Sequence, residues 1–164
     1  MNDLSASLGL ASARIYAAFG SKESLFREAI ALYEGEEGGF ADRALEQDAN
    51  VVTSFRQMFE DAIALYTRKG QPRGCMVVSS ATNCTVENEG IGESLAQHRR
   101  KRTGVIIRRL KTAVINGEVA PTLDVNAVGE LIAATLHGLS VQARDGASQK
   151  RLLAIIPPLL SLLK

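Results

Sequence analysis

Few side chains in this sequence have the types and spacing that catalysis or metal binding requires. Cys75 and Cys84 are nine residues apart, and the two histidines, His98 and His137, are far from each other along the chain. Cysteine and histidine ligands of structural metal sites usually occur in pairs about two to five residues apart. No nucleophile–base set, carboxylate pair or glycine-rich phosphate loop stands out either. The sequence therefore predicts no enzyme, no metal site and no cofactor.

One cysteine has a basic neighbour. Arg73 lies two positions before Cys75, and a cation close to a thiol favours the reactive thiolate. A thiol sensor is thus one interpretation of Cys75. A buried and inert cysteine is the interpretation that we prefer, because free cysteines commonly pack as small apolar side chains.

Two polar side chains interrupt an apolar stripe in the long helix predicted over residues 91–116. Leu95 and Ile106 belong to that stripe, and His98 and Arg102 occupy the same line between them. Buried polar groups need partners, and few carboxylates are close enough in the sequence to pair with Arg102. Either both side chains face a ligand pocket between helices, or both lie at the edge of the helix in solvent.

The composition indicates a helical globular protein. The chain has 164 residues, of which 46% are hydrophobic and 23% charged, which excludes disordered and collagen-like classes. A net charge of +1 means that any affinity for nucleic acid must come from a local patch. Two cysteines, no apolar leader and no apolar run long enough to cross a bilayer predict a cytoplasmic protein that does not enter a membrane.

Apolar spacing predicts helices throughout and no strand pairing. Residues 75–85 are ambiguous, because Met76, Val77 and Val78 could begin a strand, but the rest of the chain offers no partner strand. The final stretch is expected to kink or break at Pro157 and Pro158. The predicted fold class is an all-α bundle, with helices over residues 3–8, 12–19, 22–33, 49–69, 75–85, 91–116, 125–144 and 148–163.

The first two short helices, joined by a turn at Gly9, have the arrangement of a helix-turn-helix. The stretch that follows the turn reads GLASARIYAAFGSKESLF over residues 9–26. It closely resembles the recognition-helix region of TetR-family transcriptional regulators, with the family's glycine, tyrosine, phenylalanine, Lys-Glu and leucine all in place. Residues 72–75 and 138–148 resemble the same family less specifically.

The resemblance implies a ligand-responsive repressor with a DNA-binding head over residues 1–33 and a helical ligand-binding body over residues 34–164. Tyr16 and Lys22 suit phosphate oxygens, which fix the register of a protein on DNA. Arg14 suits a guanine edge or a phosphate. The residues expected to contact operator DNA are Ser12, Ala13, Arg14, Tyr16 and Lys22.

The sequence departs from the family in its first residues. Family members carry a further helix before the position of Met1, and that helix covers the apolar face of the next two. In addition, residues 1–33 carry no net charge, because three basic residues balance three acidic ones. The alternative hypothesis is therefore a ligand-binding helical dimer that has lost DNA binding through the absence of the first helix.

The resemblance also implies an effector pocket and a homodimer formed by the last two helices. A mostly hydrophobic small molecule with at least one hydrogen-bond acceptor is the expected effector, although its predicted apolar lining would suit an ordinary core equally well. The predicted pocket residues are Phe55, Met58, Phe59, Met76, His98 and Arg102. The predicted dimer residues are Leu131, Gly138, Leu152, Ile156 and Leu160.

Overall fold

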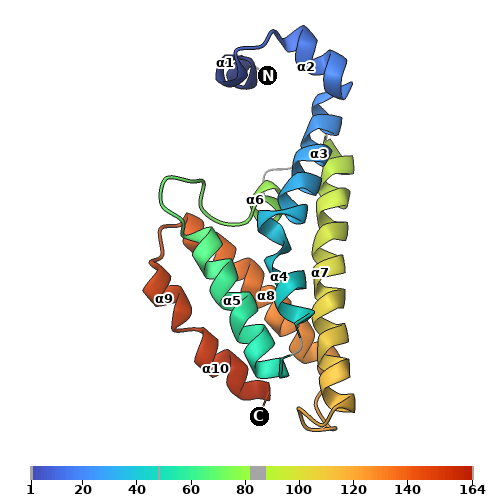
Figure 1. The fold of residues 1–164 in the computed structure, drawn as a ribbon, viewed down its shortest axis with the longest axis vertical. Coiled ribbons are helices and arrows are strands. Elements are labelled where there is room, and N and C mark those ends of the chain that lie inside the picture. Colours follow the sequence, from blue (N-terminus) through green and yellow to red (C-terminus); the bar gives the residue numbers. More distant parts are fainter. Residues whose placement is uncertain (1, 48, 82–87, 164) are drawn as a thin grey trace.

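The computed structural model describes residues 2–47, 49–81 and 88–163. Those residues form helices joined by short loops and include no strand, so the all-α prediction is confirmed (Figure 1). The elements are α1 (Asn2–Leu8), α2 (Ser12–Phe19), α3 (Lys22–Gly35), η1 (Glu37–Gly39), α4 (Phe40–Leu45), α5 (Val51–Tyr66), α6 (Met76–Ala81), α7 (Glu89–Ile115), α8 (Val125–Arg144), α9 (Gln149–Leu153), α10 (Ile156–Leu160) and η3 (Ser161–Leu163).

Side-chain caps explain where several helices begin. The Ser21 hydroxyl accepts a hydrogen bond from the Ser24 amide at 3.0 Å, as its position before α3 predicts. Asn50 caps α5 in the same way, accepting from the Thr53 amide at 2.9 Å. Each cap satisfies an amide that the first turn of a helix leaves without a partner.

The structure differs from the sequence prediction at one joint and confirms the predicted break at another. Residues 34–39 form the end of α3 and the turn η1, and α4 follows where no helix was predicted. Gly38 is required in this turn, because a Cβ atom there would lie 2.6 Å from the Tyr33 ring. The last helix breaks between α9 and α10, just before the prolines, and Pro157 and Pro158 occupy the first turn of α10. That turn tolerates proline because its amides lack partners within the helix.

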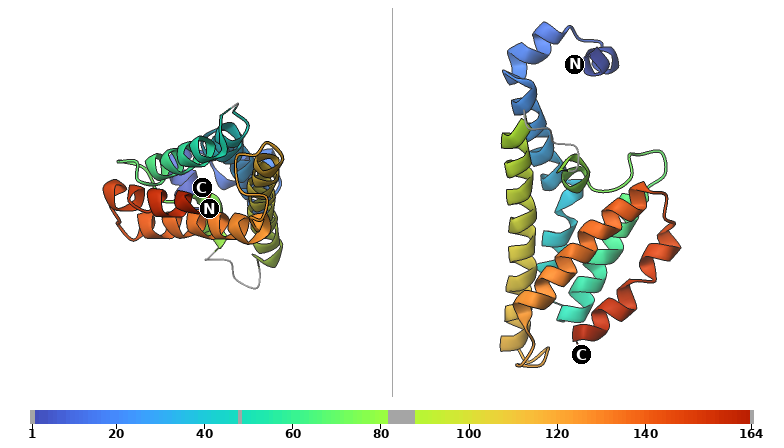
Figure 2. Two further views of the ribbon diagram at one scale, coloured as in Figure 1. Left: turned by 90° about the horizontal axis from the view of Figure 1, so that it is seen from below. Right: turned by 180° about the vertical axis from the view of Figure 1, so that it is seen from behind.

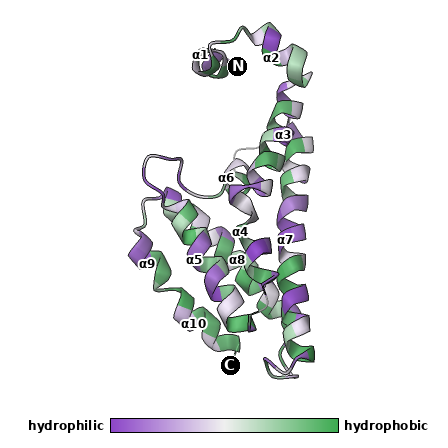
Figure 3. Cartoon of the chain, in the orientation of Figure 1, coloured by the Kyte–Doolittle hydropathy of each residue, from purple (hydrophilic) through white to green (hydrophobic). Residues whose placement is uncertain are grey.

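The body encloses α5. Its Phe55, Met58 and Phe59 side chains have no exposed surface. Helices α8, α9 and α10 pack against it, α4 and α7 complete the enclosure, and two further views show the same arrangement (Figure 2). The hydropathy of each residue follows this packing, with hydrophilic residues on the outer α7 and hydrophobic ones along α10 (Figure 3).

The head stands at one end of the molecule (Figure 1). It comprises α1, α2 and the start of α3, and its buried residue is Ile15, at 3% exposure. Helix α3 continues from this head into the body, where it runs parallel to α7. Two hydrogen bonds join the pair, from Arg27 to the carbonyl of Gly90 and between Glu34 and His98. None of the described helices is long and apolar enough to cross a membrane.

Candidate DNA-contacting head and ligand pocket

Helix α2 presents a polar face to solvent. Ile15 points inward, and this leaves Ala13, Arg14 and Tyr16 exposed, with 42% of Tyr16 accessible. Lys22 is exposed at the first position of α3. These four residues are therefore available to a ligand on the outer side of the head, as their predicted role requires.

Ser12 is placed differently from the other predicted contact residues. Its hydroxyl lies 2.8 Å from that of Ser5 on α1, and the side chain is partly buried. This hydrogen bond links the first two helices of the head. Ser12 thus fixes the angle between α1 and α2, and its hydroxyl is already engaged.

Apolar side chains of the head are unusually exposed. Leu4 and Leu8 on α1 are 38% and 56% exposed, and Leu10 in the turn is 38% exposed. Residues of this size at adjacent helical positions normally pack against another element. The head accordingly has an apolar face that the described residues do not cover.

Glu34, near the end of α3, is the partner of both polar residues in the α7 stripe. Its carboxylate lies 2.5 Å from Nδ1 of His98 and 3.7 Å from the Arg102 guanidinium. Arg102 also donates to the Gly38 carbonyl at 3.1 and 3.2 Å and lies over the Phe40 ring. Both polar residues thus meet a carboxylate from a distant part of the sequence, 64 residues from His98, and Arg102 needs no ligand to pair with.

We call Glu34, His98 and Arg102 the Glu34 clamp, and it holds the end of α3 against α7. Replacing Glu34 with Ala should lower the free energy of unfolding by about 1–3 kcal/mol, because His98 and Arg102 would lose a shielded partner. Urea unfolding measures the loss. Glu28→Ala, on the exposed side of the same helix, is the matched control and should change stability by less than about 0.5 kcal/mol. Equal effects of the two substitutions would contradict the role of the clamp.

A small cavity of about 30 Å³ adjoins the clamp, and His98 and Arg102 line it. This volume suits a water molecule or two, not a small-molecule effector. His137 also faces it, and burial, together with Arg99 and Arg102, lowers the pKa of the His137 imidazole. His137 is therefore neutral at pH 7.

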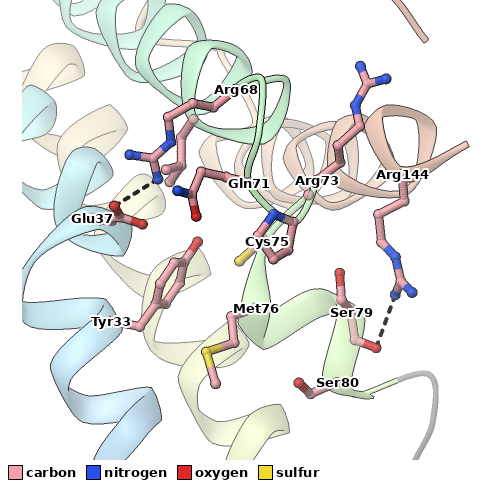
Figure 4. A pocket seen from close by; sticks show the side chains of 13 residues that line it. Tyr33, Glu37, Arg68, Gln71, Arg73, Cys75, Met76, Ser79, Ser80 and Arg144 are labelled. Atoms are coloured by element: carbon pink, nitrogen blue, oxygen red, sulfur yellow. Dashed lines mark hydrogen bonds and ion pairs between the residues drawn. The ribbon is translucent and has the colours of Figure 1, made fainter. Parts of the chain in front are cut away.

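A larger pocket of about 740 Å³ lies on the other side of Tyr33 and Cys75 (Figure 4). It is formed where the end of α3 and the turn η1 meet the loop after α5, the start of α6 and the end of α8. Its lining comprises Tyr33, Glu37, Leu65, Arg68, Gln71, Pro72, Arg73, Gly74, Cys75, Met76, Ser79, Ser80 and Arg144.

The predicted pocket residues are thus divided among three places. Met76 lines the large pocket, and His98 and Arg102 line the small cavity. Phe55, Met58 and Phe59 line neither of these and are fully buried in the core. Their assignment to a pocket is corrected, because they lie on the inward face of α5, where its large side chains fill the centre of the body.

The predicted dimer residues also fall into two groups, one buried and one at least partly exposed. Leu152, Ile156 and Leu160 are at most 2% exposed, because they pack inside this chain, and their assignment to a dimer face is corrected. Leu131 is 46% exposed, and Gly138 is half-buried. Both lie on an exposed stripe along α8, which we call the α8 stripe and which consists of Ala127, Leu131, Ala134, Gly138 and Val141.

Several pocket residues have no signal in the sequence. Tyr33 reads as one more apolar position of α3, and Glu37, Arg68 and Arg144 read as surface charges. Only Arg73 and Cys75 stand out, through their proximity in the chain. Cys75 is buried in the structure, as preferred, whereas Cys84 lies outside the described residues. No group of three or more metal-ligating side chains occurs in the described ranges.

Comparison with known families and proteins gives consistent results. Residues 51–152 match the family described as tetracyclin repressor-like, C-terminal domain. The HTH-type transcriptional repressor ComR of Escherichia coli (strain K12) is 27% identical over 154 residues. That alignment covers 93% of this chain and 73% of ComR.

Two solved structures are similar over nearly the whole chain. A cysteine mutant of the TetR family transcriptional regulator CifR, complexed with 26-base-pair operator DNA, superposes with a TM-score of 0.93 and 32% identity. The match covers 98% of this chain and 84% of CifR. A putative TetR transcriptional regulator from Rhodococcus sp. RHA1 gives a TM-score of 0.70 with 26% identity, covering 99% of this chain and 86% of that protein.

Proposed function

This chain belongs to the TetR family of transcriptional regulators, and on that premise we propose that it is a repressor that binds operator DNA and releases it when a small molecule binds. It is a regulator and not an enzyme, as the sequence predicted. ComR is a repressor, and the CifR structure contains operator DNA. These two properties of relatives support the assignment of the same activity to this chain.

One observation supports the proposed response to a ligand. Helix α3 begins in the head at Lys22, and its last turns pack on the body, where Tyr33 lines the large pocket and Glu34 binds His98 of α7. We divide the chain into a head over residues 1–33 and a body over residues 34–164, and α3 is the rigid connection between them. If a ligand binds more tightly when α3 is in one position than in another, it shifts the equilibrium toward that position of α3 and of the head. The size of the shift is set by the difference in affinity.

In the head, we assign DNA contacts to the exposed face of α2 and the start of α3. Tyr16 and Lys22 bind phosphate oxygens, and Arg14 reads a base edge in the major groove. Ala13 lies beside Arg14 and is also exposed, and its small side chain allows the DNA to approach α2 closely. Ser12 contributes indirectly, by holding α1 against α2.

In the body, we assign the dimer interface to the α8 stripe. Its members are spaced four, three, four and three residues apart, which is the spacing that brings two helices together along their length. Two of them are alanines and one is glycine, so a second copy of α8 can approach closely.

The proposal is tested by the effects of three substitutions on DNA binding. Tyr16→Phe and Lys22→Ala should weaken binding to operator and to random duplexes by equal factors, because phosphates carry no sequence information. Arg14→Ala should relax the preference at one base pair per half-site by about 1–3 kcal/mol. Fluorescence anisotropy on duplexes selected in vitro measures both effects, with Lys69→Ala in the body as the control. Unchanged sequence preference in Arg14→Ala would reduce Arg14 to a phosphate contact.

The alternative function is a ligand-binding dimer that does not bind DNA, and the exposed Leu4 and Leu8 support it. We propose that operator binding requires a further helix on this apolar face of the head. The two functions are separated by comparing the 164-residue chain with a fusion that places an amphipathic helix before Asn2. DNA binding by the fusion supports the repressor, and failure of both forms supports the alternative.

A further inference from the structure

We propose that the large pocket binds an amphipathic organic anion, with an apolar body and a carboxylate or similar acidic group. The inference rests on the proposed function, because it identifies this pocket as the effector site and specifies the chemical class of the effector. It extends the expectation of a hydrophobic molecule with an acceptor group to a molecule with a negative charge.

Hydrogen bonds hold one wall of the pocket in place. Its wall is the loop over residues 70–74, and three hydrogen bonds fix that wall to the neighbouring helices. The Gly74 amide donates to Tyr66, the Cys75 amide to the Ser140 hydroxyl, and Arg73 to the Ala147 carbonyl, at 3.0, 2.7 and 2.7 Å. The pocket's volume of about 740 Å³ is within the usual range for small-molecule sites.

Apolar groups form one part of the lining. Leu65, Pro72 and Met76 belong to the lining. The Tyr33 ring lies near Met76 (Figure 4). Met76 is flexible and adapts to irregular shapes. This part of the surface therefore favours a hydrocarbon or aromatic body in the ligand.

The charges in the lining favour a negative ligand. Three guanidinium groups and one carboxylate line the pocket, so its net charge is +2. Glu37 neutralises Arg68 through an ion pair of 2.7 Å. Arg73 and Arg144 make no ion pair with any described residue, and Arg144 makes only a long 3.5 Å hydrogen bond to the Ser79 carbonyl.

Two buried polar atoms provide independent support. Nε of Arg73 is buried without a hydrogen bond to a described residue, and the Tyr33 hydroxyl, also buried, has only the Cys75 thiol and the Met76 backbone beside it among the described residues. Both can donate, and burial raises the pKa of the Tyr33 hydroxyl, so that it stays protonated. A buried donor without an acceptor is costly, and an anionic oxygen is the strongest acceptor that a ligand can offer.

The experiment compares three probes that share one apolar body: 4-phenylbutyrate, 4-phenylbutanol and 4-phenylbutylamine. Isothermal titration calorimetry on the full chain should give the carboxylate an affinity at least about tenfold above that of the alcohol, with the amine weakest. Arg144→Gln should lower the affinity for the carboxylate about tenfold, and Arg144→Lys should retain most of it. Arg56→Gln, on the exposed side of α5, is the matched control and should change nothing.

Three results would overturn the inference: equal affinity for the three probes, no binding of the carboxylate at millimolar concentration, or an Arg144→Gln affinity equal to that of the wild type. Circular dichroism establishes that each variant is folded. A separate operator-release assay distinguishes the two proposals. Binding of the carboxylate without release of DNA contradicts the proposed ligand response alone, and DNA binding with no preference for the carboxylate contradicts this inference alone.

Discussion

Replacing Leu131 and Val141 together with Glu should convert a dimer of this protein into folded monomers. Both side chains lie on the α8 stripe, at 46% and 44% exposure, so that glutamates there are well solvated in the monomer. In the dimer, four carboxylates would meet in an apolar interface, which is strongly unfavourable. Analytical ultracentrifugation at micromolar concentration measures the change in mass.

The same double variant should lose affinity for a two-half-site operator by about a hundredfold or more. A dimer presents two heads to two half-sites, and the second contact benefits from the high effective concentration that the first creates. Ile115→Glu, at an 83% exposed position near the end of α7, is the control and should leave both assembly and DNA binding unchanged. A wild-type monomer, or a variant that remains dimeric, would contradict the interface.

Ile156→Glu should behave in a different way from the α8 variants. Ile156 is 2% exposed inside this chain, so a glutamate there places a charge in the core. The expected result is unfolding or aggregation, with a loss of more than about 3 kcal/mol. A folded Ile156→Glu monomer would restore the original assignment of this residue to the dimer face.

The second large effect is expected at Glu118, just beyond the end of α7. Its carboxylate accepts hydrogen bonds from Arg109 at 3.0 and 3.2 Å and from the Val51 amide at the start of α5. The Arg109 and Glu118 side chains are only 11% and 18% exposed. Glu118→Ala would leave a shielded guanidinium and a helix-start amide without this acceptor, and should lower the free energy of unfolding by about 3 kcal/mol.

Urea unfolding at a fixed protein concentration measures this loss. Glu93→Ala is the control, because Glu93 pairs with Arg100 in solvent, where both side chains are about 60% exposed. An exposed ion pair contributes at most about 1 kcal/mol. If the two variants lose equal stability, the burial of the Arg109–Glu118 pair has no energetic consequence.

The contribution of Glu118 to the free energy of unfolding should also depend on pH. Hydrogen bonds from Arg109 are the main cause that lowers the pKa of Glu118 below its ordinary value of 4.5. A carboxylate whose pKa is lower in the folded state than in the unfolded state stabilises the fold. This stabilisation is complete at a pH above the pKa of the unfolded state and is lost as the pH falls through the pKa of the folded state. The stability difference between wild type and Glu118→Ala should thus be constant near neutrality and shrink below about pH 4.5.

The sequence by itself determined most of the helices and the family. Helical periodicity and local capping are short-range properties, so α2 and α8 begin and end where the residues predict. The motif over residues 9–26 is a contiguous stretch, and it was sufficient to identify the helix-turn-helix head. Fold class, family and regulatory activity could therefore be predicted from neighbouring residues alone.

The tertiary structure decided which apolar residues face the core and which polar residues meet. An apolar side chain suits a core, a pocket or a dimer interface equally well, so the sequence could not assign Phe59, Ile156 or Leu131 among them. Glu34 and His98 are 64 residues apart, and Arg73 and Ala147 are 74 apart. Hydropathy and helical spacing describe one helix at a time, whereas burial and pairing depend on the neighbours that the fold brings to that helix.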